Sequence, residues 1–538
     1  MIVASVAAMS IAVSLGVLSI PAERPDTDES FCVGRVQKDI EIISRDHHSI
    51  IHPEQRNEVR NHLISRLREL GTEPALYAYP GCEGKGYRFD ALNIVGDWAP
   101  ADSANVQNAR LLIVAHYDSR YPWAPVKDTV CSYGAADDGY GVGTALETVR
   151  ILLRNRDSWS QGVRLLLTDA EEVGMVGMKK AYELNPELFQ DVGLVINLEA
   201  RGTYGPVLLF ETSPGNDKIM KLYQGFSRYP HTYSLTNVVY RMMPNFTDFT
   251  IVKDELPGVN FSTISDVNHY HTDKDCFANI SASSIRHYGA QAVPLAEEFV
   301  RNPEYADKDS LRGSGDRVFF TVPLLGLFNF SKTGYLLVNI IALLLLAGVL
   351  LSGSRKCLSA LCRAGIWLLV AVAALAVGEG AAWLGCKISG AHFALFGTIS
   401  GMPFDNALMV ALAVLLALLI ALMYKRGKVL EKLEGCLILL GTLDIILLAA
   451  LGENLFVFIP LTVSCLAILL WKFSGWKLFL PVGMALILLH ACSFLYDLTM
   501  ALTVGAGGAV LLIATFEFAA AIGLAALFCS DDQGLTKR

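Results

Sequence analysis

Leu111-Leu-Ile-Val-Ala115 runs directly into His116-Tyr-Asp118, and this stretch decides the fold. Its apolar run has the length of a buried strand, and polar residues stand where that strand would end. Val163–Thr168 and Leu194–Leu198 repeat the pattern, since each is largely apolar and each leads into carboxylate residues. Gly141–Leu153, between the first two runs, has apolar residues at helical spacing. Buried strands that alternate with helices predict an α/β fold with a mixed, largely parallel sheet between helices.

The composition of the chain excludes one class of partner. Of its 538 residues, 53% are hydrophobic, and the hydrophobic excess lies beyond Val318. The stretch before Val318 is long enough to bury one substantial core. The formal net charge is −8, and the soluble part holds no cluster of Lys and Arg. We therefore expect no nucleic-acid partner, because phosphate binding needs such a cluster.

Long apolar runs predict a C-terminal, all-α, multi-pass transmembrane domain of about seven spans over residues 333–538. Each run is close to the roughly 20 residues that cross the hydrocarbon of a bilayer. The lipid bilayer is therefore an expected partner. The runs lie near residues 333–351, 364–384, 405–424, 434–451, 455–471, 478–496 and 502–528.

Basic residues follow alternate spans, and this bias predicts the orientation of the chain. The positive-inside rule makes these connections cytosolic, so the domain over residues 21–305 would lie on the non-cytosolic side, extracellular or luminal. The polar stretch 306–332 would link this domain to the bilayer. The basic residues are Arg355, Lys356, Arg363, Lys425, Arg426, Lys428, Lys472, Lys477, Lys537 and Arg538.

The apolar stretch 1–20 favours an N-terminal transmembrane anchor over a cleaved signal peptide. No small-x-small cleavage site precedes the acidic stretch Glu23–Glu29. An oxidising compartment would permit disulfides among the four cysteines of the soluble part, which allow three pairings. Buried thiols are an equal alternative. These cysteines are Cys32, Cys82, Cys131 and Cys276.

Five chain segments carry residues that bind metals or activate water. Three follow the predicted strands, the fourth is a glycine-rich turn that opens a helix, and the fifth comes much later. Because the carboxyl ends of parallel strands form the sites of such sheets, we expect the segments to converge. Histidines and carboxylates without cysteine suit a catalytic zinc site. The segments are His116-Tyr-Asp118, Asp169-Ala-Glu171-Glu172, Glu199, Gly134-Ala-Ala-Asp137-Asp138-Gly-Tyr-Gly141 and His269-Tyr270-His271-Thr-Asp273.

The residue types suggest how the work is divided. A bridging carboxylate can hold two cations about 3.5–4 Å apart, which bind a nucleophilic water and polarise a carbonyl. Of the adjacent Glu171 and Glu172, one can bind metal while the other takes a proton from water. His116 and Asp118 are two residues apart on an extended chain, so Asp118 can orient the ring of His116.

The series HYD, GAADDGYG, DAEEVGMVG, NLEARG and YHTDKD resembles the zinc-dependent exopeptidase family of secreted bacterial aminopeptidases and glutamate carboxypeptidase. The resemblance covers roughly residues 110–300. An anchored domain followed by many spans is similar, within that family, to the multi-pass endoplasmic reticulum metallopeptidase and vacuolar membrane protease group. The resemblance implies a peptide substrate, two Zn²⁺ ions per chain and an exopeptidase activity of the aminopeptidase type.

The resemblance also implies the metal ligands. His116, Asp137 and Glu199 would bind one zinc ion. Asp137, Glu172 and His271 would bind the other, with Asp137 as the bridge. The family often has Asp at the position of Glu199, but Glu occurs in the membrane-linked group, so Glu199 remains an expected ligand.

The resemblance implies the catalytic roles as well. Glu171 would be the general base, Asp118 would support the histidine ligand, and Tyr270 would help to polarise the carbonyl or oxyanion. Ala136 stands where the family often has Asn, which would alter the turn and leave coordination unaffected.

Other interpretations remain open for these residues. Taken singly, the histidines would be ordinary hydrogen-bonded residues, Asp138 a helix cap and Asp248 a plain loop residue. Taken together, they also allow a glutaminyl cyclase-like aminoacyl cyclotransferase with one zinc ion, or a non-catalytic binding domain on a membrane protein. A transporter with an accessory domain is a further alternative. The oligomeric state is left undetermined.

Overall fold

The computed structural model describes residues 2–16, 20–21, 26–27, 29–122, 131–242, 245–352, 357–397, 399, 402–425 and 427–530. The chain divides into two compact units. The sheet unit comprises residues 19–321 and 326–331, and the helical unit comprises residues 1–18, 322–325 and 332–538.

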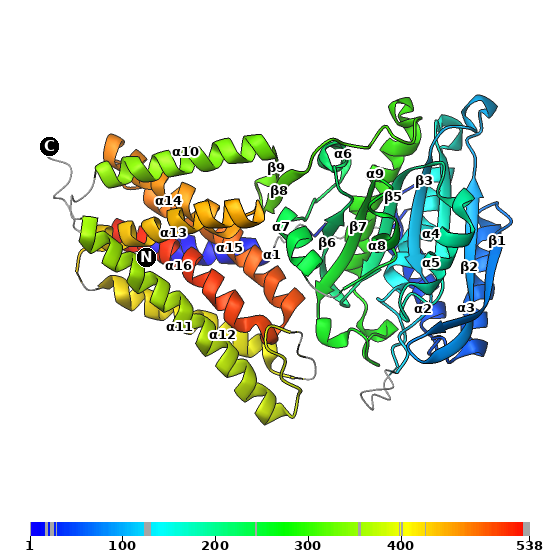
Figure 1. Ribbon diagram of the computed structural model, residues 1–538, viewed down its shortest axis with the longest axis horizontal. Helices are drawn as coiled ribbons and strands as arrows, with labels where there is room; N and C mark the ends of the chain where they lie inside the picture. The colour runs from blue at the N-terminus through cyan, green and yellow to red at the C-terminus, as the bar shows by residue number, and fades with distance from the viewer. Residues whose placement is uncertain are drawn as a thin grey trace. The chain divides into compact units, whose positions relative to one another are not determined.

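A seven-stranded sheet organises the sheet unit, in the order β1-β2-β4-β3-β5-β7-β6 (Figure 1). The four central strands are parallel, whereas β1, β2 and β6 run antiparallel to their neighbours. The predicted mixed, largely parallel sheet is therefore confirmed. The strands are β1 (Ala75–Gly84), β2 (Tyr87–Trp98), β3 (Arg110–His116), β4 (Gly162–Thr168), β5 (Val192–Ala200), β6 (Tyr204–Thr212) and β7 (Gly258–Ser265).

Helices cover both faces of the sheet because the central strands are apolar on both sides. Leu111 and Ile113 of β3 pack into the core on one face, and Leu112 and Val114 pack into the core on the other. Each such side chain contributes about 1.5–3 kcal/mol when buried. One face carries α2 (Val33–Ile43), α3 (Pro53–Glu69), α4 (Gly139–Leu153), α6 (Asp217–Phe226) and α9 (Ala282–Arg301), and the other carries α5 (Val176–Leu184) and α8 (Phe249–Val252).

The region between the two predicted domains contains structure that its polar composition did not indicate. β8 (Arg317–Val322) pairs with β9 (Gly326–Ser331) within the stretch 306–332. Phe319 and Phe320 of β8 are buried, and Phe320 forms a bridge with Tyr233 just before α7 (Ser234–Met242). Burial of these aromatic side chains extends the sheet unit beyond residue 305.

The buried histidine of α9 makes the sheet unit sensitive to acid. His287 Nδ1 accepts the Val207 N–H at 2.9 Å, and Nε2 lies 2.8 Å from the Tyr229 carbonyl oxygen. Burial lowers the pKa of His287 from 6.5 to about 3. As the pH falls, the unfolded chain therefore takes up a proton on residue 287 before the folded chain does. The stability that neutral His287 contributes is fully present above about pH 6.5 and is lost as the pH drops toward 3.

We expect the contribution of His287 to the free energy of unfolding to fall by about 2–3 kcal/mol between pH 7 and pH 4.5. His287→Gln keeps an acceptor for Val207 but does not titrate, so its melting temperature should fall less over this interval than that of the unchanged protein. Thermal unfolding of the detergent-solubilised chain at both pH values measures the difference. Equal falls in the two proteins would rule out this source of acid sensitivity.

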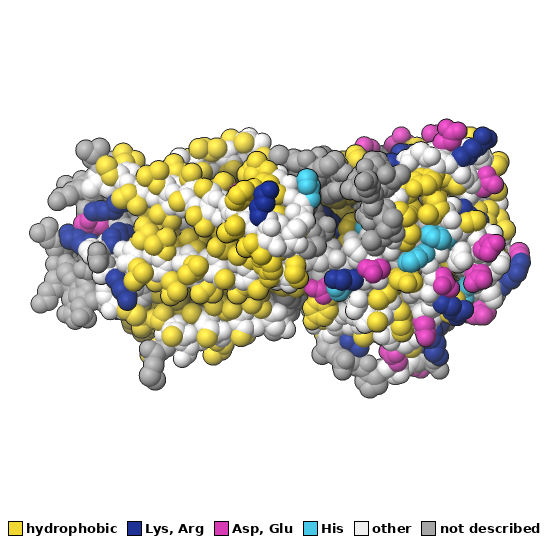
Figure 2. Space-filling model, turned by 90° about the horizontal axis from the view of Figure 1, so that it is seen from below, with side chains coloured by type: hydrophobic (Ala, Val, Ile, Leu, Met, Phe, Trp, Pro, Cys, Tyr) yellow, Lys and Arg dark blue, Asp and Glu magenta, His cyan; other side chains and the backbone are white. Residues whose placement is uncertain are grey.

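The helical unit contains, among the described residues, seven helices long and apolar enough to cross a membrane. Its surface in Figure 2 is largely hydrophobic, whereas that of the sheet unit carries many charged side chains. The N-terminal α1 (Ile2–Gly16) packs along α15, and Ser14 Oγ donates to the Leu489 carbonyl oxygen at 2.7 Å. The seven helices are α10 (Lys332–Leu351), α11 (Cys357–Ser389), α12 (Asp405–Lys425), α13 (Val429–Leu451), α14 (Leu455–Ser474), α15 (Phe479–Leu502) and α16 (Gly507–Cys529).

Basic residues from different connections lie at the same end of the helical unit. Lys472, in the last turn of α14, donates to the Ser352 carbonyl oxygen after α10 at 3.2 Å. Lys477, before α15, donates to the Ser530 carbonyl oxygen after α16 at 2.8 Å. Figure 2 shows several Lys and Arg side chains at one end of this unit and a further one nearer its other end. We call the end that carries Lys472 and Lys477 the basic end; the predicted basic residues Arg355, Lys356, Arg426, Lys537 and Arg538 lie outside the described residues.

Candidate metal centre

The five predicted segments meet at the carboxyl ends of the parallel strands. His116 ends β3, Glu171 and Glu172 follow β4, Glu199 lies at the end of β5, Asp137 precedes α4, and His271 follows β7. The ligand atoms form two groups, and within each group they all lie within 4.8 Å of one another. The groups are His116, Asp137 and Glu199, and Asp137, Glu172 and His271.

Asp137 belongs to both groups through different oxygens. His116 Nε2 lies 3.1 Å from Asp137 Oδ1 and 3.7 Å from Glu199 Oε2. His271 Nε2 lies 3.3 Å from Asp137 Oδ2 and 3.2 Å from Glu172 Oε1. One carboxylate thus faces two separate sets of donors, which is the arrangement that a bridging ligand requires.

Asp118 supports three of the site residues. The His116 Nδ1 atom lies 3.0 Å from the Asp118 carbonyl oxygen and 3.5 Å from its carboxylate. The Asp118 carboxylate accepts the backbone N–H of Glu171 at 2.9 Å and that of Glu172 at 3.3 Å. Asp118 therefore orients the histidine ring mainly through its main chain, and its side chain holds the turn that carries both glutamates.

Asp275 holds the turn that carries Asp137, and the sequence patterns did not single it out. Its carboxylate accepts the Ala136 N–H at 2.7 Å, the Asp137 N–H at 3.3 Å and the Ser132 hydroxyl at 3.0 Å. The available signal was its place in the YHTDKD motif, four residues after His271. Asp275 thus ties that motif to the glycine-rich turn.

Two further polar residues contact the candidate ligands. Arg120 Nη1 donates to the Glu172 carbonyl oxygen at 2.9 Å and lies 3.4 Å from Glu172 Oε2. Asn197 Nδ2 donates to Glu199 Oε1 at 3.1 Å and to Asn260 Oδ1 at 2.9 Å. The other carboxylate oxygen of each glutamate still faces the histidine of its group: Glu199 Oε2 faces His116, and Glu172 Oε1 faces His271.

The electrostatics of the cluster favour bound cations. Burial raises the pKa of Glu171 well above its ordinary value and that of Glu199 to about 8, with further carboxylates close to both. Burial opposes a charge on His271, but the carboxylates beside it raise its pKa to about 9. Buried carboxylates therefore outnumber the imidazoles that could balance them. Divalent cations would supply the missing charge, and histidine with carboxylate is a donor set that suits zinc.

Glu171 and Tyr270 lie beside the two groups without belonging to either. Each residue keeps some accessible surface, although its titrating group is buried. The Tyr270 ring stacks on the His271 ring, with 3.6 Å between the centroids. Burial raises the pKa of Tyr270 well above its ordinary value, so its hydroxyl stays protonated and can donate a hydrogen bond. A carboxyl group and a hydroxyl donor thus stand at the edge of the cluster.

The two ambiguous aspartates are both buried. Asp138 caps α4 by accepting the Gly141 N–H at 3.0 Å, and it also accepts the His116 N–H at 3.3 Å. Asp248, which was expected to be a plain loop residue, accepts the Thr168 hydroxyl at the end of β4. Burial raises the pKa of Asp248 to about 6. Asp138 therefore links the cap of α4 to the end of β3.

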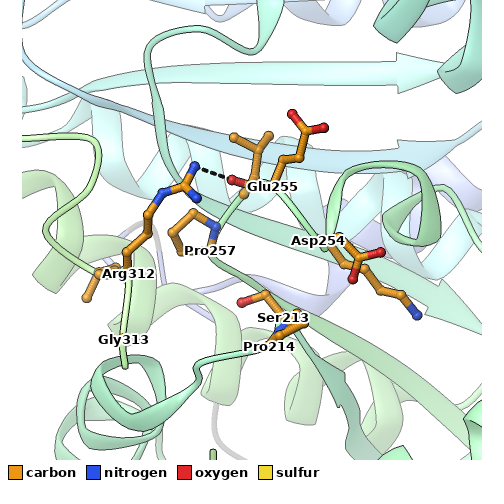
Figure 3. A pocket seen from close by; sticks show the side chains of 10 residues that line it. Ser213, Pro214, Asp254, Glu255, Pro257, Arg312 and Gly313 are labelled. Carbon is orange, nitrogen blue, oxygen red and sulfur yellow. Dashed lines mark hydrogen bonds between the residues drawn. The ribbon is translucent and has the colours of Figure 1, made fainter. Parts of the chain in front are cut away.

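A small cavity lies at the opposite edge of the sheet and is separate from this cluster. Its volume is about 110 Å³. Pro257, which precedes β7, and Ser213, which follows the antiparallel β6, line it, and Arg312 donates to the Glu255 carbonyl oxygen across it (Figure 3). Since β7 is parallel to the central strands, its amino end lies away from the candidate metal centre.

Solved structures with a similar fold include peptidases and cyclases. The glutaminyl cyclase of Porphyromonas gingivalis is 19% identical, with a TM-score of 0.41, and the match covers 50% of this chain and 99% of that one. The LapA aminopeptidase of Legionella pneumophila is 16% identical, with a TM-score of 0.40, and the match covers 51% of this chain and 73% of that one.

Two membrane proteases are similar in sequence. The human endoplasmic reticulum metallopeptidase 1 is 28% identical over 277 residues, which are 50% of this chain and 28% of that protein. The vacuolar membrane protease of Candida dubliniensis is 26% identical over 306 residues, which are 55% of this chain and 30% of that protein. The matches thus span less than a third of either relative.

With its seven apolar helices, this chain is an integral membrane protein. Residues 93–296 match Peptidase family M28, so the chain contains a domain of this metallopeptidase family.

Proposed function

We propose that the sheet unit is a di-zinc aminopeptidase, which hydrolyses peptides from their N-terminus. The observation that carries the proposal is the position of Asp137, whose two oxygens face His116 and His271 in two separate donor groups. His116 and Glu199 would complete the first zinc site, and Glu172 and His271 would complete the second. Zinc ions there would lower the pKa of water and polarise the scissile carbonyl.

Glu171 is the proposed general base. Its carboxylate would take a proton from the water that attacks the carbonyl carbon and pass it to the nitrogen that leaves as the C–N bond breaks. The hydrogen bond from its backbone N–H to Asp118 fixes the turn that carries it. Tyr270, protonated and stacked on His271, would donate to the oxygen that gains negative charge.

The same acidity supports recognition of a free amino group. Carboxylates dominate the buried charge at the strand ends, and Arg120 is already paired with Glu172. The zinc ions would offset the charge of their own ligands, so attraction for a substrate α-ammonium group would come from carboxylates outside the two groups. Glu171 and Asp248 are such carboxylates, and they support an aminopeptidase over a carboxypeptidase.

We also propose that the basic end of the helical unit lies in the cytosol and that the sheet unit lies on the non-cytosolic side. The contacts of Lys472 and Lys477 with the ends of α10 and α16 support this assignment, because they gather the basic connections at one end. Proteolysis of sealed vesicles from the outside, with each face exposed in turn, would decide between the two orientations.

The direct test is hydrolysis of an aminoacyl-amide panel by the purified full-length chain in detergent. We expect activity that a chelator abolishes and zinc restores, and no cleavage of the same panel after N-acetylation. Zinc analysis should give two ions per chain at the Asp137 groups. Cleavage of acetylated substrates would contradict the aminopeptidase assignment, and conversion of N-terminal glutamine to a cyclic product with one bound zinc would favour a cyclotransferase.

Ionisable residues inside the helical unit are expected to serve packing and not hydrolysis. Asp444 accepts a hydrogen bond from Asn454 at 2.8 Å, and His490 lies 3.1 Å from Glu517. Such buried groups are costly in a bilayer unless they are paired. Asp444→Asn and Glu517→Gln should therefore keep kcat/KM within about twofold on the aminoacyl-amide panel. A collapse of activity in well-folded variants would show that these helices take part in the reaction.

A further inference from the structure

Three side chains outside the Asp137 groups form a second cluster of metal-binding atoms. His47 and His52 belong to the segment between α2 and α3, and Cys131 lies in the segment that leads to Asp137. A ring nitrogen of each histidine and the Cys131 Sγ atom all lie within 4.8 Å of one another. Two imidazoles and one sulfur from distant parts of the sequence are thus gathered at one point.

The two rings offer metal-binding nitrogens in different ways. Ser49 Oγ lies 2.8 Å from His52 Nδ1, so one ring nitrogen is engaged and the other can bind a metal. His47 Nε2 is buried, and none of the described residues forms a hydrogen bond with it. The His47 ring also contacts the Tyr133 ring, which is tilted by 31° from it, with 4.1 Å between the centroids. A buried polar atom without a partner is costly, and a bound ion would satisfy it.

The donors differ in kind from those around Asp137. Nitrogen and sulfur atoms suit zinc and similar transition metals, whereas magnesium and calcium prefer oxygen. The Cys131 thiol would bind as the thiolate and release its proton to solvent. Three protein donors also leave a position for a fourth group, because zinc prefers four.

We infer that His47, His52 and Cys131 form a third metal site, which binds zinc or a similar transition-metal ion separately from the Asp137 groups. The ion joins the segment between α2 and α3 to the segment that enters the Asp137 turn. The two segments are already close, since the His48 N–H donates to Ser119 and a Cβ atom at Gly134 would lie 3.2 Å from the His48 ring. The site therefore supports the position of that turn without being part of it.

Cobalt substitution tests this site without any measurement of activity. The full-length chain in detergent is stripped of metal and titrated with Co²⁺. A cobalt–thiolate charge-transfer absorption should appear, and it reports this cluster alone because the Asp137 groups contain no cysteine. Zinc analysis of the reloaded protein should give one ion per chain more than the Asp137 groups hold.

Matched variants assign the absorption to its ligand. Cys131→Ser should abolish it and remove one zinc ion per chain, and His47→Ala should weaken Co²⁺ binding by at least about tenfold. Cys82→Ser, which changes another buried cysteine of the sheet unit, should leave both unchanged. Saturation of the unchanged protein with Co²⁺ without this absorption would overturn the proposal, as would an absorption that survives Cys131→Ser. Hydrolysis of aminoacyl amides is scored separately, so failure of either proposal can be told from failure of the other.

Discussion

Glu171→Gln should lower kcat on aminoacyl amides by about 10²–10⁴-fold while both zinc ions stay bound. Gln keeps the size of the side chain and the backbone N–H that bonds to Asp118. It cannot take a proton from water, however, so the step that needs a base loses its acceptor. Because Glu171 belongs to neither donor group, metal content should not change.

Steady-state kinetics and zinc analysis of the same preparation check this expectation. A matched control is Glu183→Gln, which makes the same change on an exposed residue of α5 and should leave kcat within about twofold. The proposed base would be wrong if Glu171→Gln retained full activity. It would also be wrong if the variant lost zinc in proportion to its activity, since Glu171 would then be a ligand.

Asp137→Asn should also remove activity, but by weakening the binding of the zinc ions. The neutral amide cannot serve as a shared anionic bridge between the His116 and His271 groups, so we expect these groups to hold fewer than two zinc ions per chain. The loss of several kcal/mol of charge stabilisation corresponds to a fall in kcat/KM of at least about a thousandfold. The fold should persist, since Asp275 binds the backbone N–H of residue 137 and not its side chain.

Zinc titration by calorimetry and the melting temperature separate these effects. Asp102→Asn, at an exposed position away from the strand ends, is the control and should bind two zinc ions at the Asp137 groups. Two tightly bound ions in Asp137→Asn, counted in a Cys131→Ser background that removes the His47–His52–Cys131 ion, would contradict the bridging role. If Glu171→Gln kept its zinc and Asp137→Asn did not, the two carboxylates would be assigned to base and bridge respectively.

Local pattern was enough to predict the central part of the fold. The apolar runs at residues 111–115, 163–168 and 194–198 became β3, β4 and β5, and no run was extended by more than two residues at either end. Such runs are informative because a strand buried on both faces must be apolar throughout. The antiparallel β1 and β2 carry a weaker signal, since they lie at and next to the edge of the sheet and mix buried with exposed residues.

The candidate ligands could likewise be found by their residue types and by their places after strands. The residues that hold these ligands in position could not be found in this way. Asp118 holds Glu171 and Glu172 at sequence separations of 53 and 54 residues, and Asp275 binds Ala136 at a separation of 139. No periodicity connects residues so far apart, because such contacts depend on which strands are neighbours in the sheet.

The sequence by itself therefore determined the parallel core, the apolar helices and the set of histidines and carboxylates available for metal binding. Only the tertiary structure decided that one oxygen of Asp137 faces His116 and the other faces His271, and that His47, His52 and Cys131 meet. The physical reason is range. Secondary structure follows from hydrophobic burial along a few consecutive residues, whereas a site depends on the angles and separations that the folded sheet imposes on distant side chains.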